Sequence, residues 1–109
     1  MTVYVSGKPL CEGAQRELAR NDGRAGDFRV RMICLEDAGT LAAAGANARR
    51  ATEDSTTVGY LGEPSTIVDA AGIAQISTSS GATAMARLLR AIQQADGDSL
   101  RESVLEQIR

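Results

Sequence analysis

Residues 57–77 read TVGYLGEPSTIVDAAGIAQIS and contain two short apolar runs, Thr57–Leu61 and Gly72–Ser77. The segment between them, Pro64–Ala71, has the apolar spacing of a short helix. Brief apolar runs of this kind are typical of strands that are buried on both faces of a parallel sheet. Two such strands joined by a helix predict a right-handed crossover within one parallel sheet.

The same alternation precedes this stretch. Val3–Ser6 is another apolar run, whereas Phe28–Leu35 alternates apolar residues with arginine before it becomes apolar throughout, which suits an edge strand. Lys8–Asn21 and Thr40–Glu53 have helical spacing and lie between the strands. The order predicts a three-layer α/β fold: a doubly wound parallel sheet of about four strands in the order 2-1-3-4, flavodoxin-like or Rossmann-like.

Two further helices are expected at the C-terminal end. Gly81–Ala95 has the strongest apolar face, and Ser99–Ile108 opens with Ser99 and Glu102 at the spacing of a capping box. They bring the number of helices to about five, and we expect residues 81–109 to pack back on the sheet. A chain of 109 residues without a repeat or a linker has enough residues for one core, so residues 1–109 are predicted to be a single domain.

Composition excludes several classes of protein. The formal charge is −2, with 12 basic and 14 acidic residues, and 3% of the residues are aromatic. A nucleic-acid-binding surface normally needs a basic stripe, often with stacking aromatic rings, so nucleic acid is rejected as a partner. No apolar run approaches the roughly 20 residues that span a bilayer, so we expect no membrane insertion.

Motifs of catalysis and cofactor binding are not found in the sequence. The chain contains no histidine, the usual base beside a serine or cysteine nucleophile. It has neither a G-x-G-x-x-G segment after the first strand nor a phosphate-binding G-x-x-x-x-G-K-[ST] segment. We therefore predict no catalytic residue, no cofactor and no metal site.

Ligands of open α/β sheets bind beyond the carboxyl ends of the strands. Ser6, Gly62 and Glu63 are predicted to lie there, together with four hydroxyl residues that precede a helix: Ser77, Thr78, Ser79 and Ser80. The hydroxyl residues offer side-chain and backbone donors to an anion such as a carboxylate. The alternative is that Ser79 or Ser80 only caps the helix.

Glu63 also has two interpretations. Its carboxylate either pairs with the ammonium group of a ligand or is a favourable charge in the first turn of the short third helix.

Cys11 and Cys34 are the only cysteines. We expect them to meet where the first helix covers the sheet. They either form a disulfide, as in an exported protein, or remain two buried thiols, as in the cytosol.

Several segments together resemble a known family. They are GRAGDFRVRMICLEDAG (23–39), GANARRATEDSTTVGYLGE (45–63), AAGIAQISTSSGA (70–82) and the tail LLRAIQQADGDSLRESVLEQIR (88–109). In order and spacing they are similar to type 1 periplasmic solute-binding proteins, and within these to the branched-chain amino-acid receptors of ABC transporters.

The resemblance implies a function and a location. Members of the family have two lobes, and this chain corresponds to the first lobe with the returning C-terminal helices. The loops that hold the α-carboxylate and α-ammonium of an amino acid fall on Gly62, Glu63 and Ser77–Ser80. We expect weak binding of an amino-acid-like zwitterion, or none, because one lobe alone leaves the ligand half exposed. The resemblance also implies a periplasmic, extracellular or cell-surface location.

The short third helix predicts self-association. Pro64–Ala71 is about 12 Å long at 1.5 Å per residue, which is too short to cover the sheet beside the third and fourth strands. We therefore expect exposed apolar surface there and a homodimer that buries it. The second reading of the chain is thus a vestigial or engineered, self-associating α/β scaffold without a ligand, which would be cytoplasmic.

Overall fold

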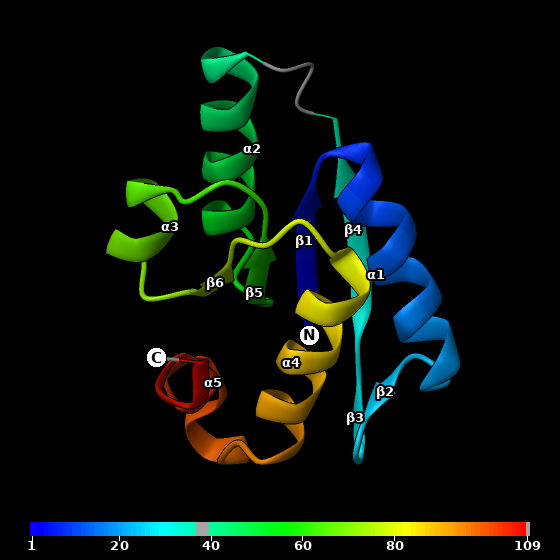
Figure 1. Ribbon diagram of the computed structural model, residues 1–109. Helices are drawn as coiled ribbons and strands as arrows, with labels where there is room; N and C mark the ends of the chain where they lie inside the picture. Colours follow the sequence, from blue (N-terminus) through cyan, green and yellow to red (C-terminus); the bar gives the residue numbers. More distant parts are fainter. Residues whose placement is uncertain (37–39, 109) are drawn as a thin grey trace.

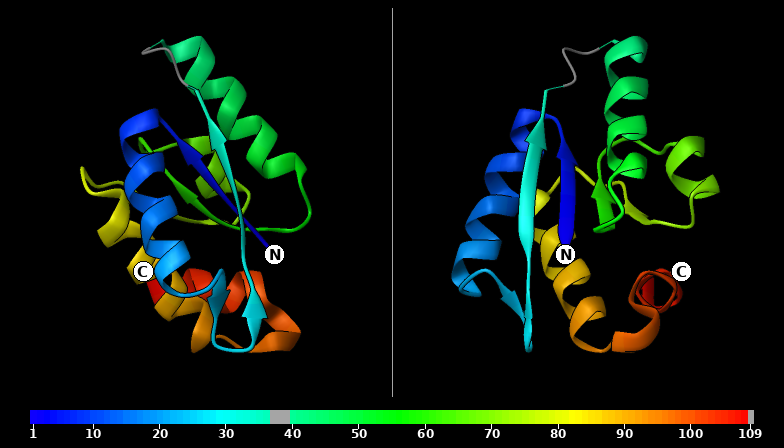
Figure 2. Two further views of the ribbon diagram at one scale, coloured as in Figure 1. Left: turned by 90° about the vertical axis from the view of Figure 1, so that its right-hand side faces the viewer. Right: turned by 180° about the vertical axis from the view of Figure 1, so that it is seen from behind.

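The computed structural model describes residues 1–36 and 40–108 and shows a parallel sheet flanked by helices on both faces (Figures 1 and 2). Within those residues, the sheet has four strands in the order β4-β1-β5-β6. The strands are β1 (Thr2–Ser6), β4 (Arg31–Leu35), β5 (Thr57–Leu61) and β6 (Ala74–Ile76). The α/β class and the strand order 2-1-3-4 are confirmed.

Among the described residues, five α-helices and one turn of 3-10 helix make up the outer layers. The helices are α1 (Lys8–Arg20), α2 (Leu41–Glu53), α3 (Thr66–Ala70), α4 (Gly81–Gln93) and α5 (Leu100–Ile108), and the 3-10 turn is η1 (Gly97–Ser99). Helices α1, α4 and α5 pack on one face of the sheet, and α2 and α3 pack on the other.

Each face of the sheet has its own core, because successive side chains of a strand point to opposite faces. Val3 and Val5 of β1 face α1 and α4, whereas Tyr4 faces α2 and α3. All five residues of β1 and of β5 are buried. This explains why both strands read as unbroken apolar runs in the sequence.

The predicted edge strand 28–35 is divided in the structure. Its first part, β3 (Phe28–Arg29), pairs antiparallel with β2 (Arg24–Ala25), and the parallel strand β4 starts two residues later. Gly26 adopts a φ of +61° in the connecting turn, a conformation that glycine reaches without strain. β4 does form one edge of the sheet, as expected.

The two shorter helical segments begin at other residues than predicted. Helix α3 starts at Thr66 instead of Pro64, because the Ser65 hydroxyl caps it by accepting a bond from the Val68 N–H. Helical structure near the C-terminus begins before Ser99, because the Asp96 carboxylate accepts a bond from the Asp98 N–H and starts η1. The predicted capping box at Ser99 is therefore wrong.

The apolar surface expected beside α3 is not found. α5 packs against β5 and β6 on one face of the sheet, and α3 covers β6 on the other. In the part of the chain that the structure describes, Leu41 at the start of α2 is the exposed large hydrophobic residue, 94% accessible.

No helix among residues 1–36 and 40–108 combines the length and the apolar character that crossing a bilayer requires.

Candidate functional site

The sheet has its topological switch point between β1 and β5. The chain passes from β1 to β4 on one side, then to β5 on the other side of β1. Ligands of open α/β sheets bind in the crevice beyond the carboxyl ends at such a point. The residues that end β1 and follow β5 are Ser6 and Gly62, two of the residues that the sequence predicted for the site.

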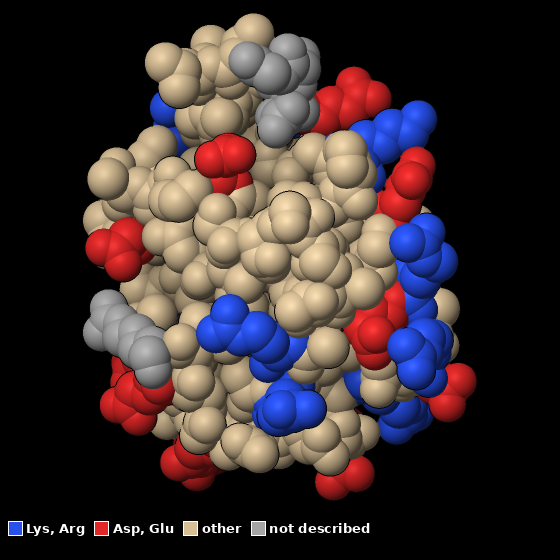
Figure 3. Space-filling view, in the orientation of Figure 1, with Lys and Arg blue, Asp and Glu red and all other residues tan. Residues whose placement is uncertain are grey.

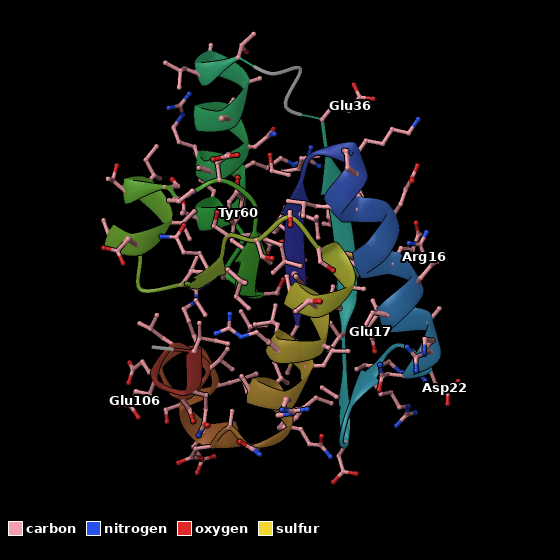
Figure 4. All side chains as sticks on the ribbon, viewed as in Figure 1. Arg16, Glu17, Asp22, Glu36, Tyr60 and Glu106 are labelled. Atoms are coloured by element: carbon pink, nitrogen blue, oxygen red, sulfur yellow. A yellow bond between two sulfur atoms is a disulfide. The ribbon has the colours of Figure 1, made fainter. Side chains whose placement is uncertain are left out.

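Gly62 lies against Ser6 and Tyr60. A Cβ atom at Gly62 would lie 3.1 Å from the Ser6 Cβ and 3.2 Å from the Tyr60 Cε2. The Gly62 N–H donates to the Ile76 carbonyl at 3.2 Å, which extends the pairing of β5 and β6 by one residue. Tyr60, labelled in Figure 4, is 2% exposed and lies on the α2–α3 side of the sheet. This packing fixes the position of the loop after β5.

Asn47 of α2 joins two strand ends at this edge. Its side-chain amide donates to the Ser6 Oγ at 3.1 Å and to the Glu36 carbonyl at 2.9 Å. The Ser6 hydroxyl accepts this bond and is left with its own proton to donate. The sequence analysis missed Asn47. One feature of the sequence points to this residue. It is the single amide side chain among the alanines on the inner face of α2, where Ala48 and Ala51 are buried.

Some side chains of the hydroxyl-rich loop form hydrogen bonds at the start of α4, and others form none with the residues that the structure describes. Ser80 caps α4, since its Oγ accepts from the Thr83 N–H at 3.2 Å, and Thr78 Oγ1 accepts from the Ser80 N–H at 3.3 Å. The capping interpretation is thus confirmed for Ser80. Ser77 and Ser79 are exposed, and their hydroxyls make no hydrogen bond with any other residue that the structure describes. They remain available to a ligand.

Glu63 is exposed and lies outside the third helix. α3 has Ser65 as its cap and Thr66 as its first residue, and the acid in its first turn is Asp69. The interpretation of Glu63 as a first-turn charge is therefore wrong. Its carboxylate forms no ion pair within residues 1–36 and 40–108.

The start of α4 is held close to α1. A Cβ at Gly81 would collide with the Leu10 carbonyl oxygen and would lie 2.9 Å from the Ala14 nitrogen. Only glycine lets the two backbones approach this closely. The loop that contains Ser77–Ser80 thereby ends where α4 begins beside α1 (Figure 1).

A disulfide fixes the other side of α1. Cys11 and Cys34 are bonded, with their Cα atoms 5.9 Å apart, so α1 is tied to the edge strand β4. Cys11 is buried, whereas Cys34 is exposed. A shallow cavity of about 360 Å³ borders the bond and is lined in part by Lys8, Glu12 and Glu36.

The strongest perturbation of a titratable group lies away from this site. The Thr56 hydroxyl and N–H and the Tyr4 hydroxyl donate to Asp54 and lower the pKa of that carboxyl to about 2. Burial and the same hydrogen bond raise the pKa of Tyr4. Asp54 follows α2, and the network joins that turn to β1. It stabilises the fold and provides no catalytic group at the carboxyl edge.

The carboxyl edge is an open, largely uncharged surface. In Figure 3, the centre of the face over the loop after β6 and the start of α4 is tan, and charged side chains gather along α1 and the lower rim. The predicted ligand residues do not line the cavity beside the disulfide or the cavity at the amino ends of β1 and β4. Within the described ranges, no group of three or more histidine, cysteine or acidic residues is placed to hold a metal ion.

Comparison with known proteins finds no matching family model, no matching curated protein and no matching solved structure.

Proposed function

We propose that the chain is the amino-acid-binding lobe of a solute-binding protein reduced to one lobe, and that it binds a small zwitterion weakly. The observation that carries the proposal is the meeting of Ser6 and Gly62 at the switch point, on the same edge as the two uncommitted hydroxyls of Ser77 and Ser79. The ordered sequence segments that resemble amino-acid receptors support it.

The available groups have the chemistry that a zwitterion needs. The hydroxyls of Ser77 and Ser79 donate to the α-carboxylate, and the positive end of the α4 dipole favours its charge. Glu63, on the neighbouring loop, is the acceptor for the α-ammonium. β5 and β6 are adjacent strands, so both loops leave the sheet side by side.

Weak affinity follows from the openness of this edge. Ligand sites with strong binding bury 70–90% or more of a small ligand. One lobe covers a single side of the ligand and leaves the other in water. We expect dissociation constants in the millimolar range and no catalytic role.

An exported location is part of the proposal. Disulfides persist in secreted and periplasmic proteins and are rare in the reducing cytosol. The bond between Cys11 and Cys34 supports export. The role would be the capture of an amino acid for transport or sensing.

The experiment is an NMR titration of the ¹⁵N-labelled chain with L-leucine. We expect saturable shifts of the amides of Gly62 and of Ser77–Ser80, and loss of binding in the double variant Ser77→Ala/Ser79→Ala. Ser55→Ala is the matched control, because Ser55 is an exposed serine at the α2–β5 turn. Shifts that persist unchanged in the double variant would contradict the assignment of these hydroxyls.

The second candidate function is that of a self-associating scaffold without a ligand, and one observation favours it. Leu41 is 94% exposed at the start of α2, which is unusual for so large an apolar side chain. If it mediates a homodimer, light scattering at tens of micromolar gives twice the monomer mass, and Leu41→Gln restores the monomer. A monomeric mass of the unchanged chain rejects this function.

A further inference from the structure

A second polar surface lies at the opposite edge of the sheet, near the amino ends of β1 and β4. A cavity of about 610 Å³ opens there. Arg29 and Arg31 line it together with the hydroxyl residues Thr2 and Thr56. None of these residues belongs to the proposed amino-acid site, so this surface is independent of it.

Two arginines, Arg29 and Arg31, line this cavity, and a third lies beside one of them. In the β2–β3 hairpin, Arg24 is paired directly opposite Arg29. Like charges in this position destabilise a hairpin, because their Cβ atoms are only about 5 Å apart. Arg31 follows Arg29 by two residues and lines the same cavity. In extended chain at 3.3 Å per residue, the Cα atoms of the two arginines are about 7 Å apart. The cluster is unusual in a chain whose net charge is −2.

Most donors of this cluster are unused. The side chains of Arg24 and Arg29 make no hydrogen bond or ion pair within the described parts of the chain. Arg31 donates from one amino group to the Thr2 Oγ1 at 3.2 Å and lies 3.9 Å from the Asp54 carboxylate. Its side chain is 67% exposed, so the other donors of its guanidinium face solvent.

We propose that this cavity binds the phosphoryl group of a phosphate monoester. Two guanidiniums on neighbouring positions match a phosphate, because each presents a planar fork to two of its oxygens. The volume exceeds what a bare phosphate needs and lies in the range of small-molecule pockets. Met1 supplies apolar wall for the organic part of the ester, next to the extended segment at Val30.

A substitution of Asp22 tests whether the positive charge of the cavity wall controls binding. It is the acidic residue among those that line the cavity, and it forms no ion pair with either arginine. Its φ is +56°, a conformation that asparagine also tolerates, so Asp22→Asn preserves the backbone. The variant removes one negative charge from the wall. We expect it to bind a phosphate monoester several times more tightly.

The experiment is calorimetry with the full chain and phenyl phosphate at about 20 mM salt, where screening is weak. We expect Arg29→Gln to weaken binding by about tenfold, as for the loss of a charge-assisted bidentate contact. Arg16→Gln is the matched control, because Arg16 is an exposed arginine of α1 that does not line this cavity, and we expect no change. Arg29 has no partner to lose, and its replacement removes the repulsion from Arg24, so the variant should melt at the same temperature as the wild type or slightly above it.

A parallel titration with inorganic phosphate separates the two sources of a phosphoryl group. Tighter binding of phenyl phosphate supports the ester. Equal binding of the two probes overturns the part assigned to Met1. An equal loss in Arg29→Gln and Arg16→Gln, or no heat with phenyl phosphate up to about 10 mM, overturns the site as a whole.

Discussion

Gly13 of α1 faces Gly81 of α4 at the point where the two helices cross. A Cβ at Gly13 would lie 3.5 Å from the Gly81 Cα and 2.9 Å from the Ala82 nitrogen. The crossing positions the start of α4, and with it the hydroxyl loop of the proposed site. The geometry of this loop therefore depends on two residues that cannot touch a ligand there.

Replacing Gly81 by alanine should destabilise the protein. The new methyl group would collide with the Leu10 carbonyl oxygen, and backbone cannot move aside as a flexible side chain can. We expect a loss of about 2 kcal/mol or more in the free energy of unfolding. Urea denaturation followed by circular dichroism measures it.

Gly45 is the control for this substitution. It also lies in a helix, but a Cβ there would meet nothing closer than the end of the Arg49 side chain at 3.5 Å. Gly45→Ala should raise the stability by about 0.5–1 kcal/mol, because alanine favours the helical backbone. Changes of the same sign in the two variants would contradict the close approach of α1 and α4.

Removing the disulfide should cost about 3 kcal/mol. The bond closes a loop over a sequence separation of 23, which limits the unfolded chain. The double variant Cys11→Ser/Cys34→Ser and the wild type in dithiothreitol should lose similar stability in urea. If neither loses stability, the disulfide does not constrain the chain.

Stability should fall in acid because of Asp54. Its pKa is lowered from 3.8 to about 2 in the folded protein, so the unfolded chain binds the proton more readily. The contribution is complete above pH 4 and is lost as the pH falls from about 4 to 2. We expect about 1 kcal/mol, since solvent screens a partly exposed group.

The variant Asp54→Asn tests this origin. The difference in stability between the wild type and the variant should be present at pH 7 and should shrink below about pH 4. A difference that stays constant down to pH 2 would mean that Asp54 does not titrate in this range.

Arg101 holds the C-terminal helix to the sheet. Its guanidinium donates to the carbonyls of Thr57 at 2.9 Å, Asp54 at 3.3 Å and Ser55 at 3.4 Å. We expect Arg101→Gln to cost about 1–2 kcal/mol and to speed hydrogen exchange in α5. Arg87→Gln, an exposed arginine of α4, should change neither, and equal effects of the two variants would contradict the role of Arg101.

The sheet was predictable because its strands differ from their surroundings. β1 and β5 are buried on both faces, and this alone makes Val3–Ser6 and Thr57–Leu61 apolar without alternation. The order 2-1-3-4 places these two strands in the middle of the sheet. The β2–β3 hairpin was missed, because strands of two residues are too short to show any period.

The site was only partly predictable. Ser6, Gly62 and the loop 77–80 follow from the rule on carboxyl ends, and they do lie at one edge. Asn47 and Arg101 were missed, because their partners are 41 and 44–47 residues away and nothing local specifies such contacts. One of the two interpretations of Glu63 placed it beside the first turn of a helix that in fact begins later, because the Ser65 cap competes with the proline signal at Pro64.

The central claim is that the carboxyl edge still recognises both ends of an amino acid. The most direct measurement compares three ligands by NMR: L-leucine, leucinamide without the carboxylate, and N-acetyl-leucine without the ammonium. We expect saturable millimolar binding of leucine at Gly62 and Ser77–Ser80, and binding of both analogues that is at least several times weaker. Shifts of equal size with all three ligands, no shift with leucine, or micromolar affinity for it would contradict a weak zwitterion site on a single lobe.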